Sequence, residues 1–299
     1  MRIGHREEHR SEPTVAGAVR AALAVAGDMG LEASSPRVLA QHGNVVVALD
    51  PEPVVARVCG VLAPLRPNRG GDHMRRELAL MSWIAERGGP VVPPSHLVDP
   101  GPHLRDGYWL GFWEPADGPA DVDADGAAPV LRELHDLLAG YEGDLPVMSQ
   151  VIDDVPPMLA AAVASGGLDA EAGAMVAARL ERLTPTLLDP PLPVQPIHGD
   201  AQPHNLMRRD GRLAWIDFEE CCRGPVEWDL ACLYRGWQDV RIPDLAAYGS
   251  AVDPDALLPF IEGRMLQGAA YLGLLAADDP ERRPRRDELL ERLERLPEL

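Results

Sequence analysis

The sequence predicts an α+β protein of two lobes, a small one rich in β-strands and a larger one that is mainly helical. Short apolar runs separated by Pro, Gly and Asp dominate the first part of the chain, whereas longer runs at helical spacing dominate the rest. Charge changes at the same place: residues 1–116 carry 12 arginines and 13 acidic residues, and residues 117–299 carry 16 and 34. We therefore place the two lobes at residues 1–116 and 117–299.

The small lobe is expected to begin with a helix over residues 14–28, where an alanine-rich sequence keeps helical spacing. A second helix is expected over residues 72–87, with Asp72 as its N-cap and Gly88-Gly89 as its stop. Five β-like runs complete this lobe, at residues 37–41, 44–49, 54–59, 95–98 and 108–113.

The larger lobe follows a connector over residues 115–129 that is rich in Pro, Gly, Asp and Ala. One short strand is expected over residues 213–218. The remaining patterns predict helices over residues 129–140, 149–165, 169–187, 225–237, 255–277 and 285–296.

The chain carries a net charge of −19, and all 28 of its basic residues are arginine. Without lysine it cannot form a lysine Schiff base, a Ser-Lys dyad or the GxxxxGK[ST] phosphate loop. The acidity argues against nucleic-acid binding, which needs a basic surface. The sequence shows neither a membrane-spanning run nor a signal-peptide segment, and its four cysteines form no CxxC. We expect a cytoplasmic protein with reduced thiols that binds no membrane.

The most informative block of the sequence runs from Ile197 to Leu230. Its chemistry-bearing residues stand at set spacings: His198-Gly199-Asp200, Asn205 and Ile216-Asp217-Phe218. The pattern suggests phosphoryl transfer from a nucleotide to a hydroxyl, which needs positioning and charge neutralisation. Asn205 and Asp217 supply the oxygen ligands that Mg²⁺ takes together with phosphates and water. Asp200 is then the group that orients the acceptor hydroxyl and takes its proton.

The spacing matches the protein-kinase signature HRDxxxxN and DFG, with Gly199 in place of Arg and Glu219 in place of Gly. The block resembles the aminoglycoside phosphotransferase family, the choline-kinase-like small-molecule kinases, whose HGDxxxxN, IDF and G-P-x-x-W-D-L-A segments it contains. The resemblance implies a bilobal protein-kinase-like fold. Its small N-terminal lobe has an antiparallel sheet plus a helix and binds the nucleotide, and its larger, mainly helical C-terminal lobe holds the catalytic and acceptor-binding residues.

Carried over to this chain, the resemblance makes Asp200 the catalytic base and Asn205 and Asp217 the Mg²⁺ ligands. His198 is similar to the residue that orders the catalytic loop. Asp229, in the WDLA segment, resembles a buried anchor that accepts hydrogen bonds from that loop.

The same resemblance implies nucleotide-binding residues in the small lobe. Gly43-Asn44 is similar to the turn that covers the nucleotide, and Arg57 lies on the third strand, where the basic partner of the α- and β-phosphates is expected. Glu77 on the following helix would hold Arg57. Glu114 to Ala116 would form the hinge whose backbone meets the base of the nucleotide.

These residues lead to a hypothesis: an ATP- or GTP-dependent O-phosphotransferase for a small, amine-bearing acceptor such as an aminoglycoside, with a role in antibiotic resistance. The strongly acidic second lobe favours a cationic acceptor. Glu219, Glu220, Trp237 and Asp239 are candidates to bind it through carboxylate pairing and cation–π contact. We expect the protein to be a monomer or a dimer.

Two other functions remain open at this point. A metal-dependent hydrolase would use His198, Asp200, His204 and Asp217 as ligands, since His and Asp at such spacings also occur in hydrolytic metal sites. A non-catalytic nucleotide-binding pseudokinase is suggested by Glu219 in place of Gly and by the absence of lysine.

Overall fold

The computed structural model describes residues 14–41, 43–60, 65, 70–234, 245–249 and 253–296. The chain forms two compact units, one of residues 1–74 and 94–115 and the other of residues 75–93 and 116–299. Residues 75–93, which the sequence-based division assigned to the first lobe, therefore pack with the second unit. The first unit is built on an antiparallel sheet and the second is mostly helical, so the predicted α+β class is confirmed.

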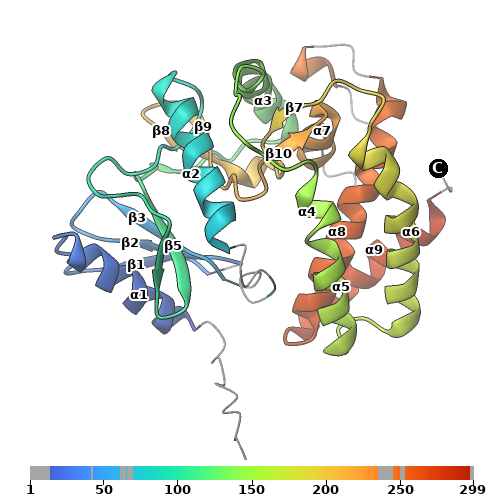
Figure 1. The fold of residues 1–299 in the computed structure, drawn as a ribbon, viewed down its shortest axis with the longest axis horizontal. Helices are drawn as coiled ribbons and strands as arrows, with labels where there is room; N and C mark the ends of the chain where they lie inside the picture. Colours follow the sequence, from blue (N-terminus) through green and yellow to red (C-terminus); the bar gives the residue numbers. More distant parts are fainter. Residues whose placement is uncertain are drawn as a thin grey trace, which may run out of the picture. The chain divides into compact units, whose positions relative to one another are not determined.

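The first unit is an antiparallel sheet covered by one helix, α1 (Val15–Asp28). The sheet has the order β1-β2-β3-β5-β4 within the described residues: β1 (Arg37–Ala40), β2 (Val45–Ala48), β3 (Val55–Val58), β5 (Tyr108–Trp113) and β4 (His103–Arg105). Figure 1 shows α1 (blue) lying along this sheet. Small alanines let the helix approach closely, and Ala21 and Ala22 share a core with Val47 and Phe112.

Two parts of this sheet differ from the sequence prediction. Residues 95–98 form no strand and contribute only the neighbouring bridge between Pro94 and Trp113, because the run leads into a proline-rich segment that has few N–H donors. Strand β4 was not predicted. It pairs with β5 through the two-residue turn Asp106-Gly107, where both residues have positive φ, the geometry that closes a tight hairpin.

The second unit contains most of α2 and the remaining helices. These are α2 (Gly70–Glu86), α3 (Ala124–Leu138), α4 (Ser149–Ile152), α5 (Val155–Ala164), α6 (Ala170–Leu188), α7 (Val226–Leu233), α8 (Leu258–Ala276) and α9 (Arg283–Arg295). Asp72, predicted as the N-cap of its helix, lies instead in the first turn of α2.

Two helix predictions in this unit were wrong at their boundaries. Helix α3 begins at Ala124 rather than near Pro129, because the Asp123 side chain accepts a hydrogen bond from the Gly126 N–H and caps the helix earlier. The single helix predicted over residues 149–165 is divided into α4 and α5. Prolines follow Val155 and lack an N–H donor, so they fit the first turn of a new helix better than the middle of a long one.

Two small sheets carry the loops of the second unit. One has the order β6-β8-β9, with β6 (Gly118–Pro119), β8 (Leu206–Arg209) and β9 (Arg212–Trp215), and the other pairs β10 (Cys222–Gly224) with β7 (Gln195–Ile197). Strands β7 and β9 end immediately before the two acidic segments of the predicted catalytic block. These short strands therefore fix where both segments begin.

Helix α8 is the central helix of the C-terminal group, and α5, α6 and α9 pack around it (Figure 1). A buried ion pair crosses from α6 to α8, with Arg179 Nη1 2.8 Å from Glu262 Oε1. The other Arg179 amino group donates to the backbone carbonyl of Leu296, just beyond α9. One arginine thus links three helices.

The four cysteines, all within the described residues, are reduced thiols that form no disulfide. Cys221, Cys222 and Cys232 are buried in the second unit, and Cys59 of the first unit is half-buried. Burial raises the pKa of the Cys221 thiol to about 12, and it also raises the pKa of Cys222 and Cys232.

Among the described residues, none of the helices combines the length and apolar character needed to cross a bilayer.

The Arg179–Glu262 pair gives a stability prediction. Glu262→Ala should lower the free energy of unfolding by about 3–5 kcal/mol, because it leaves a buried guanidinium without its carboxylate. The matched control is Glu291→Ala, which removes the exposed pair with Arg295 and should cost less than about 1 kcal/mol. Urea denaturation monitored by circular dichroism measures both, and equal losses in the two variants would contradict the prediction.

Candidate active site

The loop after β7 owes its shape to a glycine. Gly199 has φ +89°, and a Cβ built on it would lie 2.0 Å from the backbone oxygen of Glu220. Neither the conformation nor the space is compatible with another residue. The glycine at the centre of His198-Gly199-Asp200 therefore lets the loop pass directly against the turn that contains Glu220.

Asp229 of α7 fixes this loop through hydrogen bonds to its backbone. Its carboxylate is fully buried and accepts hydrogen bonds from the backbone N–H groups of His198 and Gly199, each at 2.8 Å. His135 of α3 contributes a third contact at 2.9 Å through Nε2. Trp228 completes the arrangement by donating its indole N–H to the Gly199 carbonyl at 2.7 Å. The N–H and the carbonyl of Gly199 are thus both held by adjacent residues of one helix, Asp229 and Trp228.

His198 is placed to order the loop rather than to react. Its Nδ1 accepts the Asp200 N–H at 3.2 Å, so its Nε2 carries the proton and donates to the carbonyl of Ile216 at 3.0 Å. The ring is fully buried and packs against Trp215 and Phe218. Burial lowers the pKa of His198, in keeping with this neutral form. The imidazole therefore ties the segment carrying Asp200 to the residue before Asp217.

Asp200, the predicted base, receives several donors. Oδ1 accepts from Gln202 Nε2 at 2.7 Å and from Arg264 Nη2 at 2.6 Å, and Oδ2 accepts from Asn205 Nδ2 at 3.1 Å. Burial by itself would raise the pKa of Asp200, but the Arg264 charge and the Gln202 hydrogen bond outweigh it and hold that pKa below its usual range. The residue is therefore an ionised carboxylate.

Asn205 and Asp217 are suited to hold a magnesium ion. The buried Asn205, in the 3₁₀ turn Pro203–Asn205, directs its Nδ2 at both the carbonyl and the carboxylate of Asp200. Its side-chain oxygen is then the atom left for a ligand. Asp217 follows β9 with φ +65°, a left-handed conformation that non-glycine residues adopt chiefly at functional positions. One carboxylate and one amide oxygen fit Mg²⁺, which takes its other ligands from phosphate and water.

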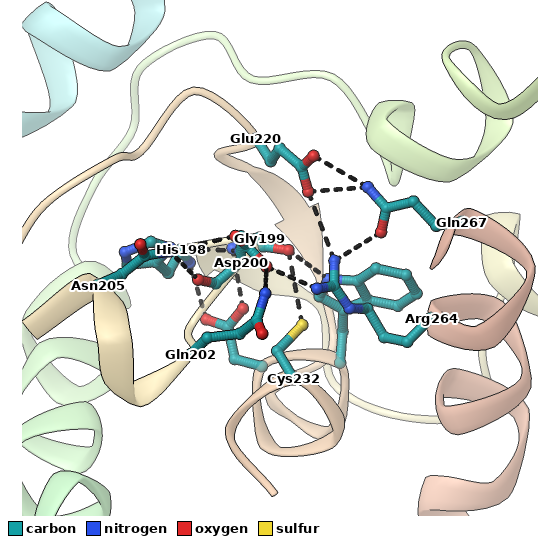
Figure 2. A network of polar contacts seen from close by, with 11 residues as sticks. His198, Gly199, Asp200, Gln202, Asn205, Glu220, Cys232, Arg264 and Gln267 are labelled. Atoms are coloured by element: carbon teal, nitrogen blue, oxygen red, sulfur yellow. Dashed lines mark hydrogen bonds and ion pairs between the residues drawn. The ribbon is translucent and has the colours of Figure 1, made fainter. Parts of the chain in front are cut away.

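A network beside Asp200 was not predicted from the sequence (Figure 2). Arg264 and Gln267 project from α8, and Gln267 Nε2 donates to both carboxylate oxygens of Glu220, at 2.9 and 3.0 Å. A sequence signal did exist, because Glu262, Arg264 and Gln267 are the only charged or amide side chains of an otherwise apolar helix. Nothing in that pattern identified their partners.

The four predicted acceptor-binding residues are only partly described. Glu220 lies in the network with Gln267, and Glu219 precedes it in the same turn. Trp237 and Asp239 lie outside the described residues.

The ligand set of the hydrolase hypothesis is not assembled. Both ring nitrogens of His198 are engaged in hydrogen bonds inside the protein, which leaves none for a metal. No group of three or more His, Cys, Asp or Glu in the described part of the chain is placed to hold a metal ion. His204 is exposed on the loop. The hydrolase hypothesis is therefore not supported.

In the first unit, the residues predicted to bind nucleotide lie on β3 and the β1–β2 turn. Arg57 is nearly buried, and its guanidinium lies over the Trp113 ring, 4.8 Å from the ring centroid. In the turn, Gly43 has φ +81°, and the side-chain oxygen of Asn44 accepts the N–H of Gly60 at 3.1 Å. The turn is thereby fixed to the end of β3.

The remaining nucleotide candidates lie in both units. Glu77 of α2 is fully buried in the second unit, where Oε1 accepts the N–H of Phe218 at 3.0 Å. Its predicted pairing with Arg57 stays a prediction. Glu114 contacts His96 at 2.6 Å in the first unit, and Ala116 is the first residue of the second unit after the crossing.

The sequence matches a known protein family over most of its length. A model of the phosphotransferase enzyme family matches residues 44–260, well over half of the chain. The chain belongs to this family. The predicted resemblance to the aminoglycoside phosphotransferases is thus confirmed, and the protein is a kinase-like phosphotransferase. Among the curated proteins, none matches its sequence.

Solved structures of kinases confirm the fold of this phosphotransferase. Amicoumacin kinase hAmiN in complex with AMP-PNP, Ca²⁺ and Ami is similar with a TM-score of 0.65 and 14% identity, over 91% of this chain and 93% of that one. A choline/ethanolamine kinase family protein from Mesorhizobium loti has a TM-score of 0.60 and 17% identity, covering 95% and 96%. The GDP and kanamycin complex of APH(2")-IIia gives 0.64 and 19%, covering 91% and 98%.

His198 gives a prediction of pH dependence. The unfolded chain takes up a proton near the usual imidazole value of 6.5, whereas the folded protein, with its lowered pKa, takes it up only at lower pH. The free energy of unfolding should therefore fall as the pH drops below 6.5, by up to about 1.4 kcal/mol per pH unit from this group. Urea denaturation between pH 8 and pH 5 measures the slope. His198→Asn should be less stable at pH 8 but show a shallower slope; an unchanged slope contradicts the assignment.

Proposed function

We propose that this phosphotransferase moves the γ-phosphate of ATP or GTP to a hydroxyl of a small, amine-bearing molecule, in the manner of an aminoglycoside kinase. One observation carries the proposal. The ionised Asp200, the Asn205 amide and the Asp217 carboxylate occur on two adjoining segments that a buried histidine and a buried aspartate hold in place. A base beside two oxygen ligands is the set of groups that hydroxyl phosphorylation requires.

In the proposed reaction, Asp200 accepts a hydrogen bond from the acceptor hydroxyl. The oxygen–hydrogen bond breaks as its proton passes to the carboxylate, and the acceptor oxygen forms a bond to the γ-phosphorus. The bond from that phosphorus to the β–γ bridging oxygen breaks, and the nucleoside diphosphate leaves. Asn205 and Asp217 would hold Mg²⁺, which neutralises phosphate charge when bound.

The nucleotide would be bound by residues of the first unit together with the hinge residues. Arg57 would pair with the α- and β-phosphates, where a planar guanidinium donates two parallel hydrogen bonds and replaces the lysine that the chain lacks. Gly43 and Asn44 would cover the phosphates, with Glu77 holding Arg57 in place. Glu114 and Ala116 would meet the base of the nucleotide.

Two observations support an amine-bearing acceptor. Residues 117–299 carry more than twice as many acidic residues as arginines, which favours approach of a cation. Similar structures include a kanamycin complex, a microcompartment-associated aminopropanol kinase and the choline kinase LicA from Streptococcus pneumoniae. Kanamycin, aminopropanol and choline all combine a hydroxyl with an amine or ammonium group. A contribution to antibiotic resistance would follow only if the acceptor is an antibiotic.

The test is a coupled assay of nucleotide consumption with ATP and GTP, across aminoglycosides, amino alcohols, choline-like amines and neutral sugars. Phosphorylation of at least one amine-bearing acceptor, with no transfer to the neutral sugars, is the expected result. Transfer to neutral sugars alone would remove the amine from the proposal. Nucleotide binding without transfer to any member of the panel would favour the pseudokinase hypothesis instead.

Asp200→Asn should lower kcat about 10²- to 10⁴-fold while leaving the KM for nucleotide nearly unchanged, because the amide cannot accept the proton. The control is Asp210→Asn, the same substitution in the exposed β8–β9 turn, where φ +51° also suits asparagine. Steady-state kinetics with the best acceptor of the panel measure both. Wild-type turnover in Asp200→Asn would rule out this carboxylate as the base.

Arg57→Ala should raise the KM for nucleotide about 10- to 100-fold, the loss expected for hydrogen bonds to a charged group. Arg57→Lys should retain part of the affinity, since it keeps the charge but not the paired donors. Arg37→Ala serves as the control, because Arg37 lies on β1 in an exposed pair with Asp50. If nucleotide KM is the same in Arg57→Ala and in the control, Arg57 does not contact the phosphates.

A further inference from the structure

Arg264 is a buried cation placed directly against the proposed base. Its side chain, only 10% exposed, projects from α8 and brings Nη2 within 2.6 Å of Asp200 Oδ1. Nη1 lies 2.5 Å from Gln267 Oε1 and 3.6 Å from Glu220 Oε2. Figure 2 shows the guanidinium between the two carboxylates, with Gln267 closing the network above it. One amino group of the guanidinium therefore contacts Asp200, and the other contacts Gln267 and Glu220, which hold the arginine in place.

The surroundings of Arg264 fix its direction. Gln267 accepts from the arginine and donates to both oxygens of Glu220, so the amide and the carboxylate hold each other in place. The guanidinium also lies over the Trp228 ring, 5.7 Å from the ring centroid. Trp228 is the residue that donates to the Gly199 carbonyl, one position before Asp200 in the loop. The contacts that orient the arginine are thus built into the same framework as the catalytic loop.

The two oxygens of Asp200 are used unequally. Oδ1 accepts two hydrogen bonds, from Arg264 and Gln202, which fill its two lone pairs. Oδ2 accepts one from the described residues, from Asn205. A second donor can therefore bind Oδ2 without displacing any hydrogen bond of the described residues, and an acceptor hydroxyl is such a donor. Rotation of the carboxylate would break the charge-assisted bond to Arg264.

We propose that Arg264 is a positioning residue for phosphoryl transfer, one that fixes Asp200 Oδ1 so that Oδ2 faces the acceptor hydroxyl. This inference rests on the proposed function, because it assigns a role to the same base. In the transfer step the hydroxyl proton passes to Oδ2 while its oxygen bonds to the γ-phosphorus, whose bond to the departing nucleoside diphosphate breaks. Glu220 is then the residue that holds Arg264 in place, rather than a residue that binds the acceptor amine.

Arg264→Gln tests the proposal. Without the guanidinium the carboxylate can rotate, and misplacement of a reacting group by about 1 Å costs on the order of 100-fold in rate. We expect kcat to fall about 10- to 100-fold, with the KM for nucleotide within about twofold of wild type. Arg264→Lys, which keeps one charged donor, should recover part of the lost kcat. If Arg264→Gln is too unstable to assay, Arg264→Lys alone decides, because a kcat equal to wild type would overturn the proposal.

The matched control is Arg179→Gln. Arg179 is equally buried at 10% exposed and, like Arg264, pairs with a carboxylate, that of Glu262 on α8, but it does not contact Asp200. Thermal denaturation gives the loss of Tm in each variant. If Arg264 acts on the base, Arg179→Gln loses Tm but retains kcat. Equal losses of kcat in the two variants would show that α8 simply has to be intact, and this would overturn the proposal.

A double variant separates positioning of the base from neutralisation of Glu220. If Arg264 only offsets the Glu220 charge, Arg264→Gln combined with Glu220→Gln should recover the kcat of wild type, and the proposal fails. If Arg264 positions Asp200, the double variant stays as slow as Arg264→Gln. Asp200→Asn in the same assay keeps the two inferences apart, since wild-type turnover in that variant would refute the proposed base itself.

Discussion

The candidate site depends on one buried carboxylate. Asp229 accepts hydrogen bonds from two backbone N–H groups of the loop after β7 and from Nε2 of His135, and each of these groups is removed from water. A carboxylate buried without donors would cost many kcal/mol, so the loop, α3 and α7 must come together for any of them to be stable. The position of Asp200 is therefore a property of the folded second unit rather than of a flexible loop.

Hydrogen bonds also connect this loop to the residues around it. His198 uses one ring nitrogen for the backbone of Asp200 and the other for the carbonyl of Ile216, so it links the two acidic segments directly. Gly199 allows the turn at Glu220 to approach closely, and that turn meets Gln267 and Arg264 from α8. Elements from widely separated parts of the sequence are thus connected through a few hydrogen bonds to this loop and to the Glu220 turn beside it.

The sequence predicted the parts of this arrangement that depend on local spacing. Asp200, Asn205 and Asp217 lie within 18 residues of each other, and that short stretch predicted Asp200 and Asn205 on one loop and Asp217 at a strand end. The family and the α+β class followed from the same block and from the periodicity on either side of it.

What the sequence missed depends on distance along the chain or on very short elements. Arg264 meets Asp200 across 64 positions, and a single arginine in an apolar helix gives no indication of its partner. Strand β4 has only three residues, too few for periodicity to indicate a strand, and it forms by pairing with β5. Helix α3 begins earlier than predicted because the Asp123 side chain caps it. Pro129 is predicted from the sequence as the start of the helix, but it lies inside it.

The cysteines differ in burial, so their reactivity can be used to measure local opening of the protein. A thiol reacts as its thiolate, so Cys221, Cys222 and Cys232, buried and with raised pKa, are protected while the second unit stays closed. Half-buried Cys59 belongs to the first unit. Thiol labelling followed over time therefore distinguishes Cys59 in the first unit from the three buried thiols, whose modification requires local opening of the second unit. The rate at which the three buried thiols react thus reports how often the unit in which catalysis is proposed opens, without any introduced label site.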